Sequence, residues 1–291
     1  MKLATGLVAG HEELLCVTPS GAIRVSRMAE RYGQSTGSWT IDMVLQQGRS
    51  ALATLSAWEQ QSLEDGMGPD HDYALLAPVT RPGKIICVGL NYRPHVAEAN
   101  FEVPSHPVLF NKFPNSVVGS GATVDVPADA EQMDYEAELV MVMGKRCSRV
   151  SEEEALDYVV GYCNGNDISA RDLQFRTSQW LLGKAADGFG PMGPYLVTGD
   201  EVPDPDALEI TGKRNGVVVQ HSNTREMIFS CRYLISYLSH YMTLEPGDVI
   251  FTGTPEGVIL GQPAEDRRWL SRGDKLTVAI EGLGELDTYI G

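Results

Sequence analysis

Short apolar runs, broken repeatedly by glycine and proline, dominate the chain from Ala77 onward. Runs of this length and texture are typical of β-strands. The clearest are Ile85–Val88, Leu139–Val142, Val217–Val219, Val249–Phe251 and Leu276–Ile280. The pair Asn215-Gly216 lies between two such runs and predicts a type I′ hairpin turn, because both residues accept positive φ angles.

Only a few segments of this region have the spacing of a helix. Apolar residues recur every three or four positions within Cys231–Met242, which predicts an amphipathic helix. Ser151 and Glu154 have the spacing of a capping box and predict a second helix that runs to Val160. Because strands and helices do not alternate regularly, we expect an α+β fold that is mostly β.

Residues 1–75 have a different pattern and are predicted to form a small N-terminal α/β domain. Two strand-like runs are followed by two helical stretches, and a segment rich in Gly, Pro and Asp at 64–71 has the composition of a linker. The strand-like runs are Leu14–Thr18 and Ala22–Val25, and the helical stretches are Ile41–Gln47 and Ala51–Leu63. We expect residues 76–291 to form the catalytic domain.

Charge limits the classes of partner. The chain of 291 residues carries 23 basic and 39 acidic side chains, a formal net charge of −16. Such a surface repels phosphate backbones and anionic lipids, so we expect neither nucleic acid nor a membrane as a partner. No apolar stretch approaches the length of a membrane span. An anionic substrate would have to be attracted by local positive charge.

The cysteines and the first residues indicate the compartment. The five cysteines are an odd number without C-x-x-C spacing, which favours reduced thiols over disulfides or a zinc ribbon. The first fifteen residues are too interrupted by Gly6, Gly10 and His11 for a signal peptide. We therefore expect a cytoplasmic protein.

Glu136 and Glu138 stand two positions apart where a strand is predicted to begin. Alternate residues of a strand point to the same face, so the two carboxylates converge. Two adjacent carboxylates repel each other unless a cation lies between them, one is protonated, or both are solvated. An isolated E-x-E is more often a solvated strand edge than a metal site.

Asp167 follows the turn-forming residues Gly165 and Asn166 and could supply a third carboxylate. Three carboxylates on rigid elements suit a hard cation, Mg²⁺ or Mn²⁺, and Ca²⁺ also takes oxygen ligands. A magnesium ion with three protein ligands keeps about three positions for water or substrate. A 2-oxo acid could occupy two of them through its carboxylate and keto oxygens.

Such a site requires further positive charge, because three carboxylates and one divalent cation remain negative. Lys184, in a Leu-Gly-Lys-Ala stretch, and Arg171 are the candidates. The alternative for each is a solvated surface charge.

His95 and Glu98 are candidates for acid–base chemistry. They stand three apart, just after Pro94, on one turn of a predicted helix. A carboxylate beside an imidazole fixes its tautomer and raises its basicity. The alternative is a pair on the surface of a helix without a function.

Five motifs in order together resemble the fumarylacetoacetate hydrolase family, over about residues 80–291. They are Gly89-Leu-Asn91-Tyr92-x-x-His95-x-x-Glu98, Glu136-x-Glu138, Asn166-Asp167-x-Ser169-Ala170-Arg171-Asp172, Gly183-Lys184 and Phe251-Thr-Gly253-Thr254-Pro255-x-Gly257. The resemblance implies a mixed β-sandwich roll and a homodimer, and residues 1–75 resemble the variable N-terminal domain of many bacterial members.

The resemblance also implies roles for individual residues. It makes Glu136, Glu138 and Asp167 the metal ligands, and His95 and Glu98 the water-activating dyad. Lys184 matches the active-site lysine of the family. Substrate contacts are implied for the three residues Arg171, Gln174 and Thr254. Leu90 stands where fumarylacetoacetate hydrolase itself has a tyrosine, so we expect a different substrate.

The reaction expected from this resemblance is hydrolytic cleavage of a C–C bond in a small 2,4-dioxo acid, such as an acylpyruvate or a sugar-derived diketo acid. The products would be pyruvate, or a related 2-oxo acid, and a carboxylic acid. Decarboxylation of oxaloacetate and isomerisation or tautomerisation of a 2-hydroxy-dienoate are alternatives on the same fold. A protein that binds a keto acid without catalysis is the alternative from another class.

Overall fold

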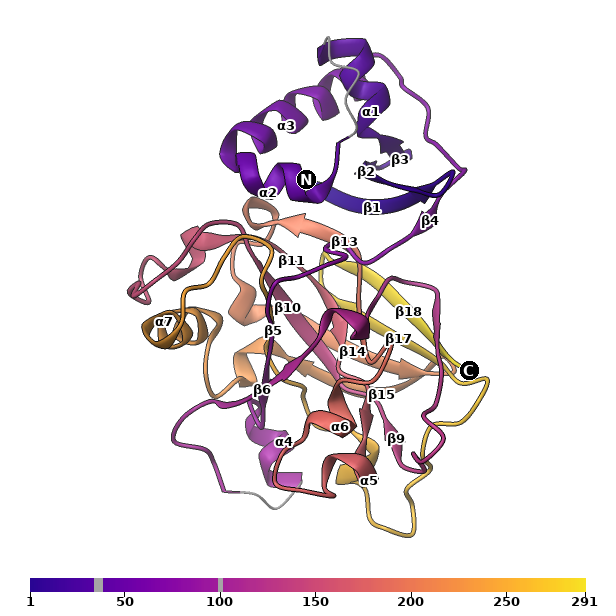
Figure 1. The fold of residues 1–291 in the computed structure, drawn as a ribbon, viewed down its shortest axis with the longest axis vertical. Coiled ribbons are helices and arrows are strands. Elements are labelled where there is room, and N and C mark those ends of the chain that lie inside the picture. The colour runs from indigo at the N-terminus through magenta and orange to yellow at the C-terminus, as the bar shows by residue number, and fades with distance from the viewer. Residues whose placement is uncertain (34–38, 99–101) are drawn as a thin grey trace.

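The computed structural model describes residues 1–33, 39–98 and 102–291. Within them, two large β-sheets with a few helices form the molecule, which confirms the predicted mostly β, α+β fold (Figure 1). The helices are α1 (Val25–Met28), α2 (Ile41–Gln47), α3 (Arg49–Glu64), α4 (Arg93–Glu98), α5 (Arg171–Gln174), α6 (Leu181–Lys184) and α7 (Cys231–Tyr241). No described helix is long and apolar enough to cross a membrane.

The larger sheet has eleven strands, nine of which follow one another in the order β3-β2-β1-β13-β11-β10-β16-β5-β6, while β4 pairs with β1 and β7 with β13. Its strands are β1 (Lys2–Val8), β2 (His11–Thr18), β3 (Gly21–Arg24), β4 (Ala74–Leu75), β5 (Ile85–Gly89), β6 (Val108–Lys112), β7 (Val117–Val118), β10 (Ala137–Met143), β11 (Val159–Asn166), β13 (Gly190–Thr198) and β16 (Val249–Phe251). The pairing is mixed, because β16 runs parallel to β5 and antiparallel to β10.

A five-stranded sheet in the order β15-β14-β17-β18-β8 and a two-stranded ribbon, β9 with β12, complete the fold. Their strands are β8 (Ala122–Val124), β9 (Met133–Asp134), β12 (Ser169–Ala170), β14 (Glu209–Arg214), β15 (Val217–Asn223), β17 (Lys275–Ile280) and β18 (Gly284–Ile290). Asn215 and Gly216 join β14 to β15 with φ angles of 52° and 81°. The predicted type I′ turn is therefore confirmed at the two positions that require positive φ.

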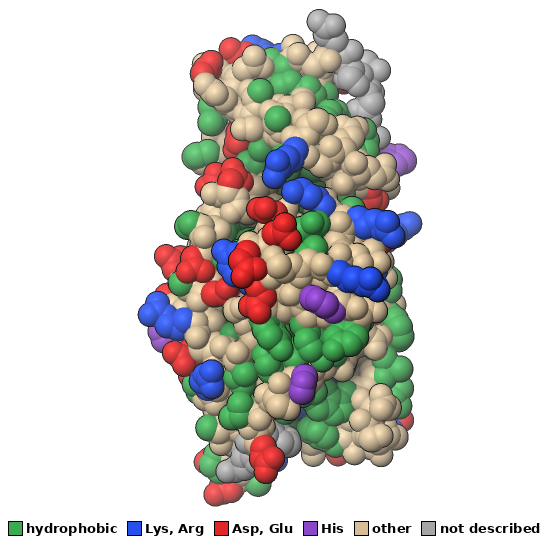
Figure 2. All heavy atoms as spheres, turned by 90° about the vertical axis from the view of Figure 1, so that its left-hand side faces the viewer, with side chains coloured by type: hydrophobic (Ala, Val, Ile, Leu, Met, Phe, Trp, Pro, Cys, Tyr) green, Lys and Arg blue, Asp and Glu red, His purple; other side chains and the backbone are tan. Residues whose placement is uncertain are grey.

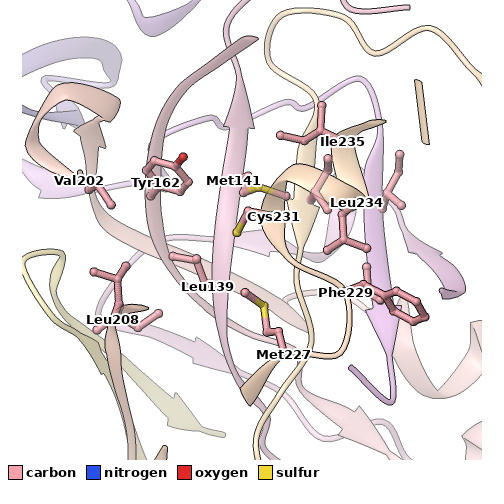
Figure 3. Packing of buried hydrophobic residues seen from close by; sticks show 14 of the residues in the cluster. Leu139, Met141, Tyr162, Val202, Leu208, Met227, Phe229, Cys231, Leu234 and Ile235 are labelled. Carbon is pink, nitrogen blue, oxygen red and sulfur yellow. The ribbon is translucent and has the colours of Figure 1, made fainter. Parts of the chain in front are cut away.

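The main core lies between α7 and the neighbouring strands (Figure 3). Leu234 and Ile235 of α7 are fully buried with Leu139 and Met141 of β10. On the outer side of α7, the rings of Tyr233 and Tyr237 stack with centroids 5.8 Å apart, and Tyr241 packs against Tyr237 at 5.1 Å with its ring tilted by 58°. Figure 2 shows hydrophobic side chains gathered on this side of the molecule.

The helix predicted from Ser151 to Val160 is wrong. The capping contact exists, because Ser151 Oγ lies 3.4 Å from the backbone nitrogen of Glu154. However, only a short 3₁₀ helix, Ala155–Tyr158, follows before β11 begins at Val159. Since β11 pairs on both sides in the middle of the large sheet, tertiary pairing overrides the local helix signal.

The division between residues 1–75 and 76–291 stays a prediction. In Figure 1 the N-terminal helices stand apart from the rest, but the sheet continues across this division. β1 pairs with β13, and Leu3 and Leu14 belong to the same buried cluster as Val140 and Leu196. The N-terminal segment therefore shares both backbone hydrogen bonds and apolar core with the remainder.

Gly165 shows how closely the central strands pack. A Cβ added there would lie 2.7 Å from the ring of Phe251 and nearer still to the side chain of Val140. We predict that Gly165→Ala lowers the free energy of unfolding by about 1–3 kcal/mol, the usual cost of overpacking. Chemical denaturation measures the change in the free energy of unfolding, and Gly68→Ala is the control.

Gly68 has no heavy atom within 4 Å of the added Cβ. Its substitution should change stability by less than about 0.5 kcal/mol. Equal effects of the two substitutions would contradict the close packing of Val140 and Phe251 against Gly165.

Candidate active site

The predicted acidic residues meet at one end of the central strands. Glu136 directly precedes β10, Glu138 lies within it, and Asp167 directly follows β11. The antiparallel register places Glu138 opposite Gly165, and the backbone N–H of Asp167 donates to the carbonyl of Glu136 at 2.9 Å. Two carboxylates that stand two residues apart and a third about thirty residues further along the chain are thereby brought together.

The cluster has the donor set of a hard-cation site. One carboxylate oxygen of each of Glu136, Glu138 and Asp167 lies within 4.8 Å of the others, and all three residues are buried. Burial, followed by the charges of Asp167 and Glu136, raises the pKa of Glu138 well above its usual range. Extra positive charge among these oxygens would relieve that repulsion, so the residues fit a divalent cation.

Lys184 points into the same cluster. Its Nζ lies 2.9 Å from Glu136 Oε2 and 2.8 Å from Asp167 Oδ2, and the residue is almost completely buried. Burial alone would lower the pKa of Lys184, but Asp167 and Glu136 outweigh it and raise that pKa. The alternative of a solvated surface charge is therefore wrong for this lysine.

Arg171 is also buried and bridges two acids. Its guanidinium lies 2.9 Å from Asp134 Oδ2 and 2.6 Å from Glu136 Oε1, and it donates to Gln174 Oε1 at 3.0 Å. Burial opposes the charge of Glu136, but Lys184 and Arg171 together lower the pKa of that carboxyl below its usual range. Glu136 is thus held ionised between two cations.

A glycine permits this arrangement of lysine and glutamine. A Cβ on Gly183 would lie 2.5 Å from the backbone of Gln174, so only glycine allows α6 to approach α5 this closely. The Gly183-Lys184 motif consequently places the lysine and Gln174 on the same wall.

The predicted dyad forms on α4, which begins at Arg93, one residue before Pro94, the predicted first residue of the helix. His95 Nδ1 lies 2.9 Å from Glu98 Oε1. The backbone N–H of Gly257 donates to both oxygens of Glu98, at 3.2 and 3.1 Å, and a Cβ on Gly261 would lie 2.7 Å from Oε1. Glu98 is therefore anchored by backbone and orients the imidazole.

A small cavity of about 40 Å³ joins the two parts of the site. His95, Glu136 and Lys184 line its polar side. Its apolar wall consists of Val88, Leu90, Phe110, Phe175, Trp180, Val258 and Leu260. Because ligand pockets typically measure about 300–1,000 Å³, the surrounding side chains must move when a substrate binds.

The remaining predicted contact residues, Gln174 and Thr254, also line this cavity. Gln220 holds Thr254 in place, since its side-chain N–H donates to the Thr254 hydroxyl at 2.9 Å. A larger hollow of about 770 Å³ lies between the α2–α3 turn and the loop after β10, away from the carboxylates. We therefore place the site at the smaller cavity.

Sequence reasoning missed three buried polar residues around the site: Lys112, Asp134 and Gln220. Lys112 Nζ lies 2.6 Å from Asp167 Oδ1. Asp134 stands two residues before Glu136 and accepts a hydrogen bond from Arg171, which it orients. The one available signal for Lys112 was strand alternation, which places it on the same face of β6 as Val108 and Phe110.

We predict that Glu138→Gln preserves folding but removes metal binding. The neutral amide keeps an acceptor for the Gly253 N–H, which donates to Glu138 at 2.7 Å, and relieves charge repulsion. Thermal unfolding with and without Mn²⁺ measures the effect. At about a hundredfold excess over Kd, bound metal should add about 2.7 kcal/mol to the parental protein and much less to the variant.

Glu285→Gln is the matched control, because Glu285 is an exposed acid paired with Lys213 in the other sheet. Equal stabilisation of Glu138→Gln and the parental protein by Mn²⁺ would rule out Glu138 as a ligand.

Comparison with known proteins identifies the family. Residues 84–290 match the family model described as fumarylacetoacetate (FAA) hydrolase C-terminal. The chain is 43% identical to the mitochondrial oxaloacetate tautomerase of Xenopus laevis over 248 residues, which cover 84% of this chain and 76% of that protein.

Two solved structures extend the similarity over the whole chain. The fumarylacetoacetate hydrolase of Exiguobacterium antarcticum has a TM-score of 0.79 at 31% identity, covering 100% of this chain and 99% of its own. The maleylpyruvate hydrolase of Sphingobium sp. SYK-6 has the same TM-score of 0.79 at 27% identity and the same coverage, 100% and 99%.

Proposed function

The chain belongs to the fumarylacetoacetate hydrolase family, and we propose that it is a metal-dependent enzyme that moves a proton at carbon 3 of a small 2-oxo acid. The observation that carries the proposal is the cavity that His95 shares with Glu136 and Lys184. A base and a buried cation facing one space are what proton removal beside a ketone requires.

Tautomerisation of oxaloacetate is the first candidate. The sequence favoured hydrolysis, but a relative 43% identical over 84% of the chain is named an oxaloacetate tautomerase. That reaction takes a proton from carbon 3 and returns one to the oxygen on carbon 2, so it requires neither a co-substrate nor an attacking water.

The dyad supplies the base. Glu98 accepts a hydrogen bond from His95 Nδ1, which leaves Nε2 free to take a proton from the substrate. The Gly257 N–H fixes the carboxylate, so Glu98 acts by orienting the ring and stabilising its charged form.

Positive charge lines the same cavity as the imidazole. Lys184 would stabilise the negative charge that develops on the oxygen at carbon 2 when the carbon proton leaves. A divalent cation, Mg²⁺ or Mn²⁺, would be held by Glu136, Glu138 and Asp167 and, when bound, would polarise the substrate oxygens. Arg171, Gln174 and Thr254 are the side chains available to orient the substrate carboxylate.

Hydrolysis of an acylpyruvate is the second candidate, favoured by the apolar wall of the cavity. Phe110 and Trp180 pack edge to face with centroids 5.5 Å apart, and Gly89 lies against the Trp180 ring. An apolar acyl group would fit this wall. His95 would then take a proton from water, which attacks carbon 4, and the bond between carbons 3 and 4 breaks to leave an enolate beside Lys184.

We predict that His95→Ala lowers kcat about 10²–10⁴-fold, the usual contribution of a positioned base. With Mg²⁺ or Mn²⁺ present, loss of the ultraviolet enol band of oxaloacetate reports tautomerisation. Release of carbon dioxide reports decarboxylation, and nuclear magnetic resonance of the products reports cleavage of acylpyruvates.

His240→Ala is the control, because His240 is an exposed residue of α7 outside the cavity. Parental rates for His95→Ala on both substrate classes would refute the assignment of the base.

The homodimer implied by the resemblance stays a prediction, which the mass of the protein in solution tests.

A further inference from the structure

Lys112, which ends the edge strand β6, is among the largest fully buried side chains of the described chain. Lysine is almost never fully buried unless its charge is paired. The ammonium is paired here with Asp167, whose Oδ1 lies 2.6 Å away. It also donates to the carbonyls of Phe189 at 2.9 Å, of Ile168 at 3.3 Å, and of Lys184.

All of these acceptors lie between β11 and β13. That segment also carries Arg171 and Gln174, whereas Lys112 comes from the strand that pairs with β5. Since β5 leads directly into α4, one ammonium ties the part of the chain that holds the dyad to the part that holds Asp167 and Lys184. A Cβ on Gly190 would lie 3.3 Å from Lys112 Cδ, so glycine leaves room for the lysine stem.

The two lysines contact different oxygens of the same carboxylate. Lys112 contacts Oδ1 of Asp167, while Lys184 contacts Oδ2 at 2.8 Å. Lys112 is held by backbone carbonyls and cannot follow a rotating carboxylate. Lys184 Nζ instead donates to the carboxylates of Asp167 and Glu136 and lies 4.9 Å from the centre of the Phe110 ring.

We propose that Lys112 is a positioning residue that fixes the carboxylate of Asp167 for metal binding and fixes the backbone of Lys184 beside it. The inference rests on the metal site of the proposed function. Partners of metal ligands typically change metal affinity by about 10–100-fold when they are removed, because the ligand loses its orientation.

The first test is the affinity of the purified protein for Mn²⁺, measured by titration calorimetry. Lys112→Met keeps the length of the stem and removes the charge, and we expect the Kd to rise about 10–100-fold. Lys213→Met is the control, because Lys213 pairs with Glu285 away from the site, and its Kd should stay unchanged. If Lys112→Met does not fold, Lys112→Gln, which keeps a donor for the carbonyls, replaces it.

The second test separates positioning of Asp167 from a general structural role. Removing either partner leaves a buried charge unpaired, so we expect Lys112→Met and Asp167→Asn each to lower the denaturation midpoint. The double variant should unfold later than the sum of the two effects predicts.

An unchanged Kd in both Lys112 variants, or additive effects in the double variant, would overturn the proposal. Failure of the parental protein to bind Mn²⁺ would instead refute the metal site itself, and the role of Lys112 would fall with it.

Discussion

Charge balance in a dry interior is the constraint on which the site depends. Four carboxylates are buried within a few side chains of one another, and among the described residues two lysines and one arginine pair directly with three of them. The acids are Asp134, Glu136, Glu138 and Asp167, and the cations are Lys112, Arg171 and Lys184. Desolvation makes every unpaired charge costly, so each of these residues fixes the conformation of its neighbours. Glu138 has no ion pair among the described residues, and a divalent cation beside it would relieve the repulsion from Asp167 and Glu136.

The fold satisfies this constraint by bringing strand ends together. The first residue of β10 pairs with the last residue of β11. Both β5 and β16 also end on this side of the sheet. The segment after β11 contains α5 and α6, and the segment after β5 contains α4. Buried strands and their ends therefore fix the carboxylates and Lys112, whereas short helices present His95, Arg171 and Lys184. A site assembled in this way tolerates little change in strand register, because a shift of one residue turns Glu138 to the other face.

His95 and Lys184 line one cavity but are held by separate contacts, and this arrangement suits enolate chemistry. The dyad of His95 and Glu98 has its own backbone anchor at Gly257, independent of the carboxylate cluster. Proton removal and charge stabilisation can therefore be tuned separately. Tautomerisation, decarboxylation and C–C hydrolysis share the enolate and differ in the bond that breaks. In the proposed function, the apolar wall with Phe110 and Trp180 would select among them by what it admits next to carbon 3.

The sequence alone predicted the fold class, the hairpin at Asn215-Gly216 and three of the four buried acids, Glu136, Glu138 and Asp167. These features have local signals: alternation, turn chemistry, and carboxylates two apart on one strand. Only the tertiary structure decided that Val159 continues β11 instead of a helix, because pairing on both sides of that strand outweighs a capping box. It likewise decided that Lys112 and Gln220 belong to the site. A lysine at the end of a strand has the same local pattern whether it faces water or a buried carboxylate, and only the packing of distant segments around it distinguishes the two.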